Sequence, residues 1–145
     1  KVDPDNTEAH YGMILNSVKK FNIDGIITTN TTLSRNNNLL SKNKREDGGL
    51  SGLPLKDPSN KVLKFLSKES NGEVVLIGVG GIETAKDVYD KIKFGASLVQ
   101  LYTAMTIYGP SLINTIKKDL VRLLASDGLN NIKDAIGVES RWVSQ

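Results

Sequence analysis

The chain has 145 residues, 39% of them hydrophobic, which supports one globular domain with its own core rather than two large domains. Its formal net charge is +3, and its 19 basic residues are interspersed with 16 acidic ones, so no stretch predicts nucleic-acid binding. The absence of cysteine excludes a disulfide framework, thiol catalysis and cysteine-ligated zinc, and with a single histidine we expect no metal site. No apolar run reaches the roughly 20 residues of a membrane-spanning helix.

The first half of the chain predicts helix, strand, helix and strand in turn. A helix capped by Thr7 is followed by the β-branched strand IDGIITTN at 23–30. The apolar residues of this helix are Tyr11, Ile14, Leu15, Val18 and Phe21. A second helix is predicted over 57–72, with Gly72 as its stop, and it leads into the strand EVVLIGV at 73–79. Its core face comprises Val62, Leu63, Phe65 and Leu66.

The second half repeats this order. Thr84 and Asp87 resemble a capping box, with Asp in place of the usual Glu or Gln, and predict a helix that ends at Gly95. SLVQLYTA at 97–104 is predicted as a strand, and Pro110 opens a last helix that Gly128 ends. The core stripe of the first of these helices is Ala85, Val88 and Ile92, and that of the second is Ile113, Ile116, Leu120, Leu123 and Leu124.

Strands that are apolar nearly throughout, separated by amphipathic helices, are typical of a parallel sheet covered by helices, so the fold class is α/β. Three strands are plain and a fourth would end at Lys1, too few for a closed eight-stranded barrel. The chain is therefore either a small open sheet or part of something larger. We favour the second, because KVDPDN at 1–6 has the character of a segment that follows a strand, although an ordinary flexible N-terminus would begin in the same way.

The connection over residues 32–58 is long for a compact α/β domain, and such connections are usually lids, binding loops or disordered inserts. Its KNKRED segment (42–47) mixes charges and is predicted to be a solvated loop tip. The GGLSG segment (48–52) differs, because glycines around a serine let the backbone approach a ligand closely and donate N–H groups to it.

The strand at 73–79 runs into Gly80 and Gly81, just before the predicted helix start at Thr84. Unhindered amides at this place can point at an anion, with the helix dipole adding to the attraction, so phosphate is the predicted guest. In (β/α)8 barrels a phosphate site is often built from the loops after the last two strands. A tight turn without a ligand stays open, because a glycine pair is a weak signal by itself.

Four motifs, in this order, resemble dihydroorotate dehydrogenase, the flavin enzyme of pyrimidine biosynthesis. They are DGIITTNTT, GGLSGLPLKD, LIGVGGIETAKDVYDKIKFGASLVQLYTAMTIYGP and NIKDAIG. The resemblance covers nearly the whole chain and implies that residues 1–145 are the C-terminal half of a single FMN-binding (β/α)8 TIM barrel, its last three to four βα units. LVQLYTA and the following GP resemble the membrane-associated, quinone-using class 2 enzymes more than the soluble class 1 enzymes.

The resemblance also implies roles for individual residues. Lys1 matches the lysine that reaches the flavin ring, where a cation stabilises negative charge on the reduced cofactor. The other implied FMN contacts are Thr29, Ser51, Gly52, Gly80, Gly81, Tyr102 and Thr103. Asn30 and Thr31 match the pair that binds the pyrimidine ring, since an amide both donates and accepts; without the resemblance they would be turn and cap residues. The implied quinone-tunnel residues are Tyr102, Met105, Thr106 and Pro110.

The implied reaction is oxidation of dihydroorotate to orotate, with reduced FMN passing its electrons to a ubiquinone-type quinone. The catalytic base of class 2 is a serine in the N-terminal half, so no catalytic residue is assigned here, and the chain alone is expected to be inactive. The implied partner is the N-terminal half of the same barrel. Membrane association is expected only through a segment outside these residues, at the mitochondrial inner membrane in a eukaryote or the cytoplasmic membrane in a bacterium.

Two alternatives remain. Another FMN- or phosphate-binding barrel, such as a class 1 dihydroorotate dehydrogenase, a dihydropyrimidine dehydrogenase or a sugar-phosphate enzyme, would share the glycine sites but not TNTT together with QLYTA. A non-enzymatic half-barrel assembly module is the second.

Four conspicuous residues are interpreted as structural: His10 as a surface residue, Trp142 as packing for the tail, and Asp24 and Asp57 as turn and helix-start residues.

Overall fold

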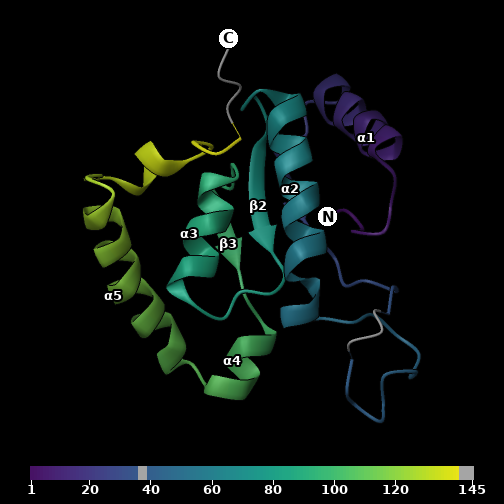
Figure 1. Cartoon of the computed structure of the whole chain (residues 1–145). Helices are drawn as coiled ribbons and strands as arrows, with labels where there is room; N and C mark the ends of the chain where they lie inside the picture. Colours follow the sequence, from purple (N-terminus) through teal and green to yellow (C-terminus); the bar gives the residue numbers. More distant parts are fainter. Residues whose placement is uncertain (36–38, 141–145) are drawn as a thin grey trace.

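The computed structural model describes residues 1–35 and 39–140, in which helices and strands alternate (Figure 1). The elements are α1 (Glu8–Lys20), β1 (Gly25–Thr28), α2 (Lys56–Ser70), β2 (Val75–Val79), α3 (Ala85–Lys93), β3 (Leu98–Gln100), α4 (Thr103–Tyr108) and α5 (Ser111–Ser126). Two 3₁₀ helices, η1 (Leu53–Leu55) and η2 (Ile132–Ala135), precede α2 and follow α5. Trp142, predicted to pack the tail, lies outside the described residues.

The three strands form one parallel sheet in the order β1-β2-β3. Ile77 of β2 is in register with Ile27 of β1 and Leu98 of β3. Val2 makes an isolated parallel bridge to Thr28, so the segment before α1 runs beside β1, at the place expected of a fourth strand. The predicted α/β class with a parallel sheet is confirmed.

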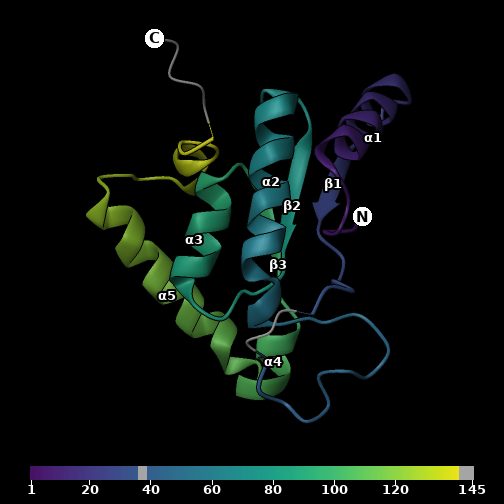
Figure 2. The same cartoon turned by 45° about the vertical axis from the view of Figure 1, so that its right-hand side comes forward.

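Helices α1, α2 and α3 lie against the same face of the sheet (Figures 1 and 2). One buried cluster joins α1 and α2 to β1 and β2, and a second joins α3 to α5 and η2. The other face carries Val75, Ile77 and Leu98, which the register brings together, and we call it the open face. Val75 is 47% exposed and Leu98 is 61% exposed, so apolar side chains of this face lack cover from the described residues.

The predicted helix ends are largely confirmed. Thr7 caps α1 by accepting a hydrogen bond from the His10 amide. At α3 both hydrogen bonds of the predicted capping box form, from the Asp87 amide to the Thr84 hydroxyl and from the Thr84 amide to the Asp87 carboxylate. Such caps satisfy amides that have no partner inside the helix, which is why the short side chain of Asp serves here as Glu does elsewhere.

Three expectations are wrong in detail. The strand predicted at 97–104 ends at Gln100, and α4 begins at Thr103, because a short apolar run does not distinguish a strand from a helix start. Phe21 is 68% exposed, since it follows the last residue of α1 and points off the core face. Ile113 is 41% exposed in the first turn of α5, whereas Ile116 is buried and Leu120, Leu123 and Leu124 pack against α3.

Across 1–35 and 39–140, no helix is long and apolar enough to span a membrane.

Candidate functional site

A cavity of about 310 Å³ lies at the carboxyl ends of the three strands. Its walls come from the segment before α1, the turns after β1 and β2, the end of the long connection, and the start of α4. All ten residues predicted to contact cofactor or substrate line it: Lys1, Thr29, Asn30, Thr31, Ser51, Gly52, Gly80, Gly81, Tyr102 and Thr103. Residues as far apart in sequence as 1 and 103 thus share one site, because parallel strands bring their carboxyl ends to one edge of the sheet.

Gly80 and Gly81 have positive φ angles of 109° and 69°, a region that side chains rarely adopt. A Cβ on Gly81 would lie 2.5 Å from the Lys56 Cα and 2.7 Å from its amide nitrogen, and one on Gly80 would lie 3.0 Å from the Leu55 side chain. The space that the missing side chains leave is therefore occupied by the start of α2. The glycine pair lets α2 approach the turn, while the predicted anion contact by the backbone of the turn stays a prediction.

The long connection is tied down at its base. Thr32 and Leu50 exchange backbone hydrogen bonds of 3.1 and 2.8 Å, which bring GGLSG back to the sheet. The Asp5 carboxylate accepts from the Thr32 hydroxyl (2.5 Å) and the Leu33 amide (2.7 Å), and these bonds lower the pKa of Asp5 even though burial alone would raise it. Thr103 donates to the Ser51 hydroxyl at 3.0 Å, so the loop closes on the start of α4.

The segment after β1 presents residues of three different environments to the cavity. Thr29 is 1% exposed, and its hydroxyl donates to the Asn30 carbonyl at 2.8 Å. The backbone N–H of Asn30 donates to the Val2 carbonyl at 2.7 Å, while the side chain of Asn30 is exposed. Thr31 packs against Gly49, where an added Cβ would lie 2.5 Å from the Thr31 Cβ. Gly49 is therefore required for packing on Thr31 rather than for approach to a ligand.

The residues predicted for the quinone tunnel are only partly brought to this cavity. Tyr102 lines it and is 77% exposed. Met105 and Thr106 follow in α4, and Pro110 caps α5, so these three lead away from the cavity along the next helix. Ile107 and Tyr108 of α4 are also exposed, at 63% and 56%, which makes α4 an apolar surface beside the site.

An internal polar cluster joins α2 and α3 behind the Gly80–Gly81 turn. Asp87 forms an ion pair with Lys56, whose backbone packs on Gly81. Burial alone would raise the pKa of Asp87, but the hydrogen bonds from Lys56, from Thr84 and from neighbouring amides outweigh it and lower the pKa. The hydrogen bond that Lys56 donates to Asp87 in turn raises the pKa of Lys56. Both groups are therefore charged at neutral pH and hold the start of α2 in place.

Lys91 belongs to the same region and was not identified from the sequence. It is 1% exposed and donates to the hydroxyl of Ser59 at 2.7 Å and to the side-chain oxygen of Asn60 at 2.8 Å. Two signals were available: Lys91 falls on the core stripe, three residues after Val88, and Gly78 interrupts an otherwise apolar strand.

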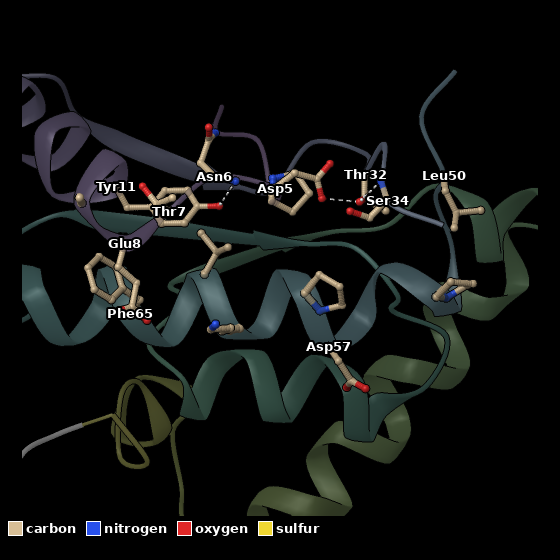
Figure 3. A pocket seen from close by; sticks show the side chains of 16 residues that line it. Asp5, Asn6, Thr7, Glu8, Tyr11, Thr32, Ser34, Leu50, Asp57 and Phe65 are labelled. Carbon is tan, nitrogen blue, oxygen red and sulfur yellow. Dashed lines mark hydrogen bonds between the residues drawn. The ribbon is translucent and has the colours of Figure 1, made fainter. Parts of the chain in front are cut away.

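A larger cavity, of about 980 Å³, lies between α1 and α2 (Figure 3) and contains none of the ten predicted cofactor and substrate residues. Tyr11 and Phe65 form part of its apolar wall, and Asp5 reaches Thr32 across one end. Asp57 is exposed in the first turn of α2 and lines this cavity, while His10 is exposed on α1 and Asp24 is exposed before β1.

The fold and the cavity together define an α/β protein of the kind in which ligands bind at the carboxyl ends of parallel strands. Residues 1–124 match the family model described as dihydroorotate dehydrogenase. The chain belongs to the dihydroorotate dehydrogenase family.

Relatives give the same assignment. The mitochondrial dihydroorotate dehydrogenase (quinone) of Mus musculus is 43% identical over 141 residues, which are 97% of this chain and 36% of the relative. The dihydroorotate dehydrogenase (quinone) of Natronomonas pharaonis is 42% identical, over 96% of this chain and 39% of the relative. The crystal structure of an Eimeria tenella DHODH in complex with ferulenol has a TM-score of 0.93 at 41% identity, covering 97% of this chain and 37% of that one. The predicted resemblance to quinone-dependent enzymes is confirmed, and the chain spans well under half the length of these relatives.

Proposed function

We propose that the complete protein oxidises dihydroorotate to orotate with FMN as cofactor and a quinone as electron acceptor, in pyrimidine biosynthesis. The observation that carries the proposal is the single cavity that unites all ten residues predicted for cofactor and substrate. Family membership supports the reaction class, and the names of the relatives support the acceptor.

Residues 1–145 would form the C-terminal part of one (β/α)8 barrel domain. A closed barrel fills its interior with side chains from every strand, so a partial barrel leaves one sheet face bare. The open face has this character, since Val75 and Leu98 are exposed on it, whereas Leu76 on the helix side of β2 is buried and Val99 on the helix side of β3 is partly buried. The partner would be the N-terminal half of the same barrel.

The residues lining the cavity suit FMN in kind. The ammonium of Lys1 and the hydroxyls of Ser51 and Thr103 are donors suited to an anion or a flavin carbonyl, and Gly52 and Gly80 add backbone with positive φ. The volume, about 310 Å³, is at the lower end of the roughly 300–1,000 Å³ of small-molecule sites. This size fits a cavity to which a second half of the barrel adds the remaining walls.

The residues of this chain would bind and orient rather than transfer protons. The exposed amide of Asn30 can pair with one edge of the pyrimidine ring, and Thr31, held by Gly49, can add a hydroxyl. When bound, FMN would supply the acceptor for hydride from one ring carbon and the route for electrons to the quinone. The base that removes the proton from the neighbouring carbon would be a serine of the N-terminal half. Lys1 would stabilise negative charge near the flavin ring.

Electrons would leave toward the apolar surface of α4. Met105 and Thr106 of α4, with Tyr102 before it and Pro110 after it, are proposed to line the quinone path. The protein would act at a membrane, the mitochondrial inner membrane in a eukaryote or the cytoplasmic membrane in a bacterium, through a segment outside these residues.

Complementation tests this proposal. The chain is expressed alone and together with the N-terminal part of the Mus musculus relative, and bound flavin and dihydroorotate-dependent quinone reduction are measured. We expect little flavin on the chain alone, and stoichiometric FMN with quinone reduction in the complemented protein. Stoichiometric FMN on the chain alone would contradict the half-barrel. A folded complemented protein without FMN or without turnover would contradict the function.

A further inference from the structure

Lys91 crosses the interior of the protein from α3 to α2. Its side chain runs over β2 at Gly78, where an added Cβ would lie 3.0 Å from the Lys91 Cδ. Its ammonium group then reaches Ser59 at 2.7 Å and Asn60 at 2.8 Å. The glycine in the middle of β2 thus makes room for a buried lysine, and also for Ala96, whose Cβ would lie 3.2 Å from the added Cβ.

The packing by itself gives no reason for a cation at this position. The two hydrogen-bond acceptors of the ammonium are neutral oxygens, and the charged groups that face it are Asp87 of its own helix and Lys56 of α2. Burial lowers the pKa of Lys91 to about 8, with Asp87 opposing this effect and Lys56 adding to it. A methionine of similar length would fill the space without the desolvation cost, so the charge calls for another explanation.

A chain of hydrogen bonds connects this charge to the Gly80–Gly81 turn. The Ser59 hydroxyl lies 3.2 Å from the Gly80 carbonyl and 3.0 Å from the Lys56 carbonyl. A protonated lysine has donors only, so Ser59 must accept from Lys91 and share its single hydroxyl proton between the Lys56 and Gly80 carbonyls. In a trans peptide the C=O and N–H groups point in opposite directions. Holding the Gly80 carbonyl toward Ser59 therefore holds the Gly81 N–H toward the opposite side.

We propose that Lys91 is a positioning residue for the phosphate of FMN, which acts through Ser59 and the Gly80 carbonyl to aim the Gly81 N–H into the cavity. Gly80 and Gly81 both line that cavity. A donor fixed in advance binds an anion without an ordering cost, and a buried cation nearby adds attraction that water screens poorly. The inference rests on the proposed function, because FMN is the ligand inferred there.

The test compares FMN with riboflavin, which lacks the phosphate, on the flavin-free complemented protein by fluorescence titration. Lys91→Met removes the charge, Ser59→Ala removes the link, and Lys93→Met is the control, since Lys93 lies on the same helix and pairs with Glu139. We expect both Lys91→Met and Ser59→Ala to weaken FMN binding about tenfold or more, with riboflavin binding changed by less than about twofold. The control should change neither affinity.

The unmodified protein gives an independent measurement. Because binding would use protonated Lys91, FMN affinity should fall as the pH rises above the Lys91 pKa of about 8, and it should level off near the affinity of Lys91→Met. The phosphate is already a dianion there, with a second pKa of about 6, so it does not titrate in this range. Lys91→Met should lose the fall in FMN affinity, and riboflavin affinity should not follow it in either protein.

Each other result counts against the inference. Equal weakening of FMN and riboflavin would make Lys91 a merely structural residue, and unchanged FMN binding in Lys91→Met would remove it from the site. Weakening by Lys91→Met but not by Ser59→Ala would refute the route through Ser59. These outcomes leave the proposed function intact, because the unmodified protein still binds FMN; failure of the unmodified protein to bind FMN would refute both.

Discussion

Gly81→Ala separates two explanations of the glycine pair. In the structure an alanine Cβ would lie 2.5 Å from the Lys56 Cα and 2.7 Å from its amide nitrogen, about 1 Å inside ordinary contact, so the start of α2 must move. Overpacking of this kind costs about 1–3 kcal/mol. The φ of 69° adds about 1–2 kcal/mol for a residue with a Cβ. Together the substitution should lower the free energy of unfolding by about 2–5 kcal/mol, a large share of the roughly 5–15 kcal/mol of a typical domain.

Urea unfolding of the flavin-free protein, followed by far-UV circular dichroism, measures this loss. Gly12→Ala is the matched control, because nothing lies within 4 Å of its added Cβ and it sits inside α1. The control should be stabilised by about 0.5–1 kcal/mol, the ordinary gain of alanine over glycine in a helix. If Gly81→Ala keeps its stability within about 0.5 kcal/mol yet loses FMN binding, the glycine serves the ligand and the packing explanation is refuted.

Three further predictions follow from the site. Asn30→Ala should weaken orotate binding by roughly 1–3 kcal/mol for each pyrimidine group left unpaired, with FMN retained, and unchanged orotate affinity would return Asn30 to a turn role. Met105→Asp should slow flavin reoxidation by quinone while reduction by dihydroorotate continues, and stopped-flow reoxidation by fumarate or NAD instead of quinone would refute the acceptor. Because the pKa of Lys91 is about 8 when folded and 10.5 when unfolded, the unfolded chain binds more protons between these values. Urea-unfolding stability should therefore rise with pH by about 3 kcal/mol across the window, and Lys91→Met, measured alongside, should lack the rise.

The repeated order of helix and strand was predictable because both kinds of element are amphipathic in ways that sequence displays. The Thr84–Asp87 capping box is a local motif, and both of its hydrogen bonds form as predicted. The boundary at 101–104 was not predictable, since LYTA suits a strand or a helix and only its place at the sheet edge decides. The exposure of Phe21 depends on α1 ending one residue before it, a boundary that spacing alone does not fix.

The candidate site was predictable through the family resemblance, which named residues that the fold then gathers around one cavity. The packing and hydrogen bonds of the residues behind that cavity could not be predicted, because they depend on contacts between segments that are distant in the sequence. The sequence gives no direct sign that Lys56 fills the space beside Gly81, or that Gly49 serves Thr31. The burial of Lys91 could not be predicted because it depends on how α3 packs against α2 and β2, and its hydrogen-bond partners are about 30 residues away in the sequence.

The paired backbone hydrogen bonds between Thr32 and Leu50 hold together the two ends of the long segment between them. Residues 42–47 lie between these paired ends and are exposed. Doubling the length of a flexible loop costs only about 0.6 kcal/mol of free energy. A fluorescent reporter inserted between Lys44 and Arg45 should therefore leave the fold intact. Such a reporter would lie about six residues before Ser51 and Gly52, which line the cavity, and it would need no substitution in the cavity wall.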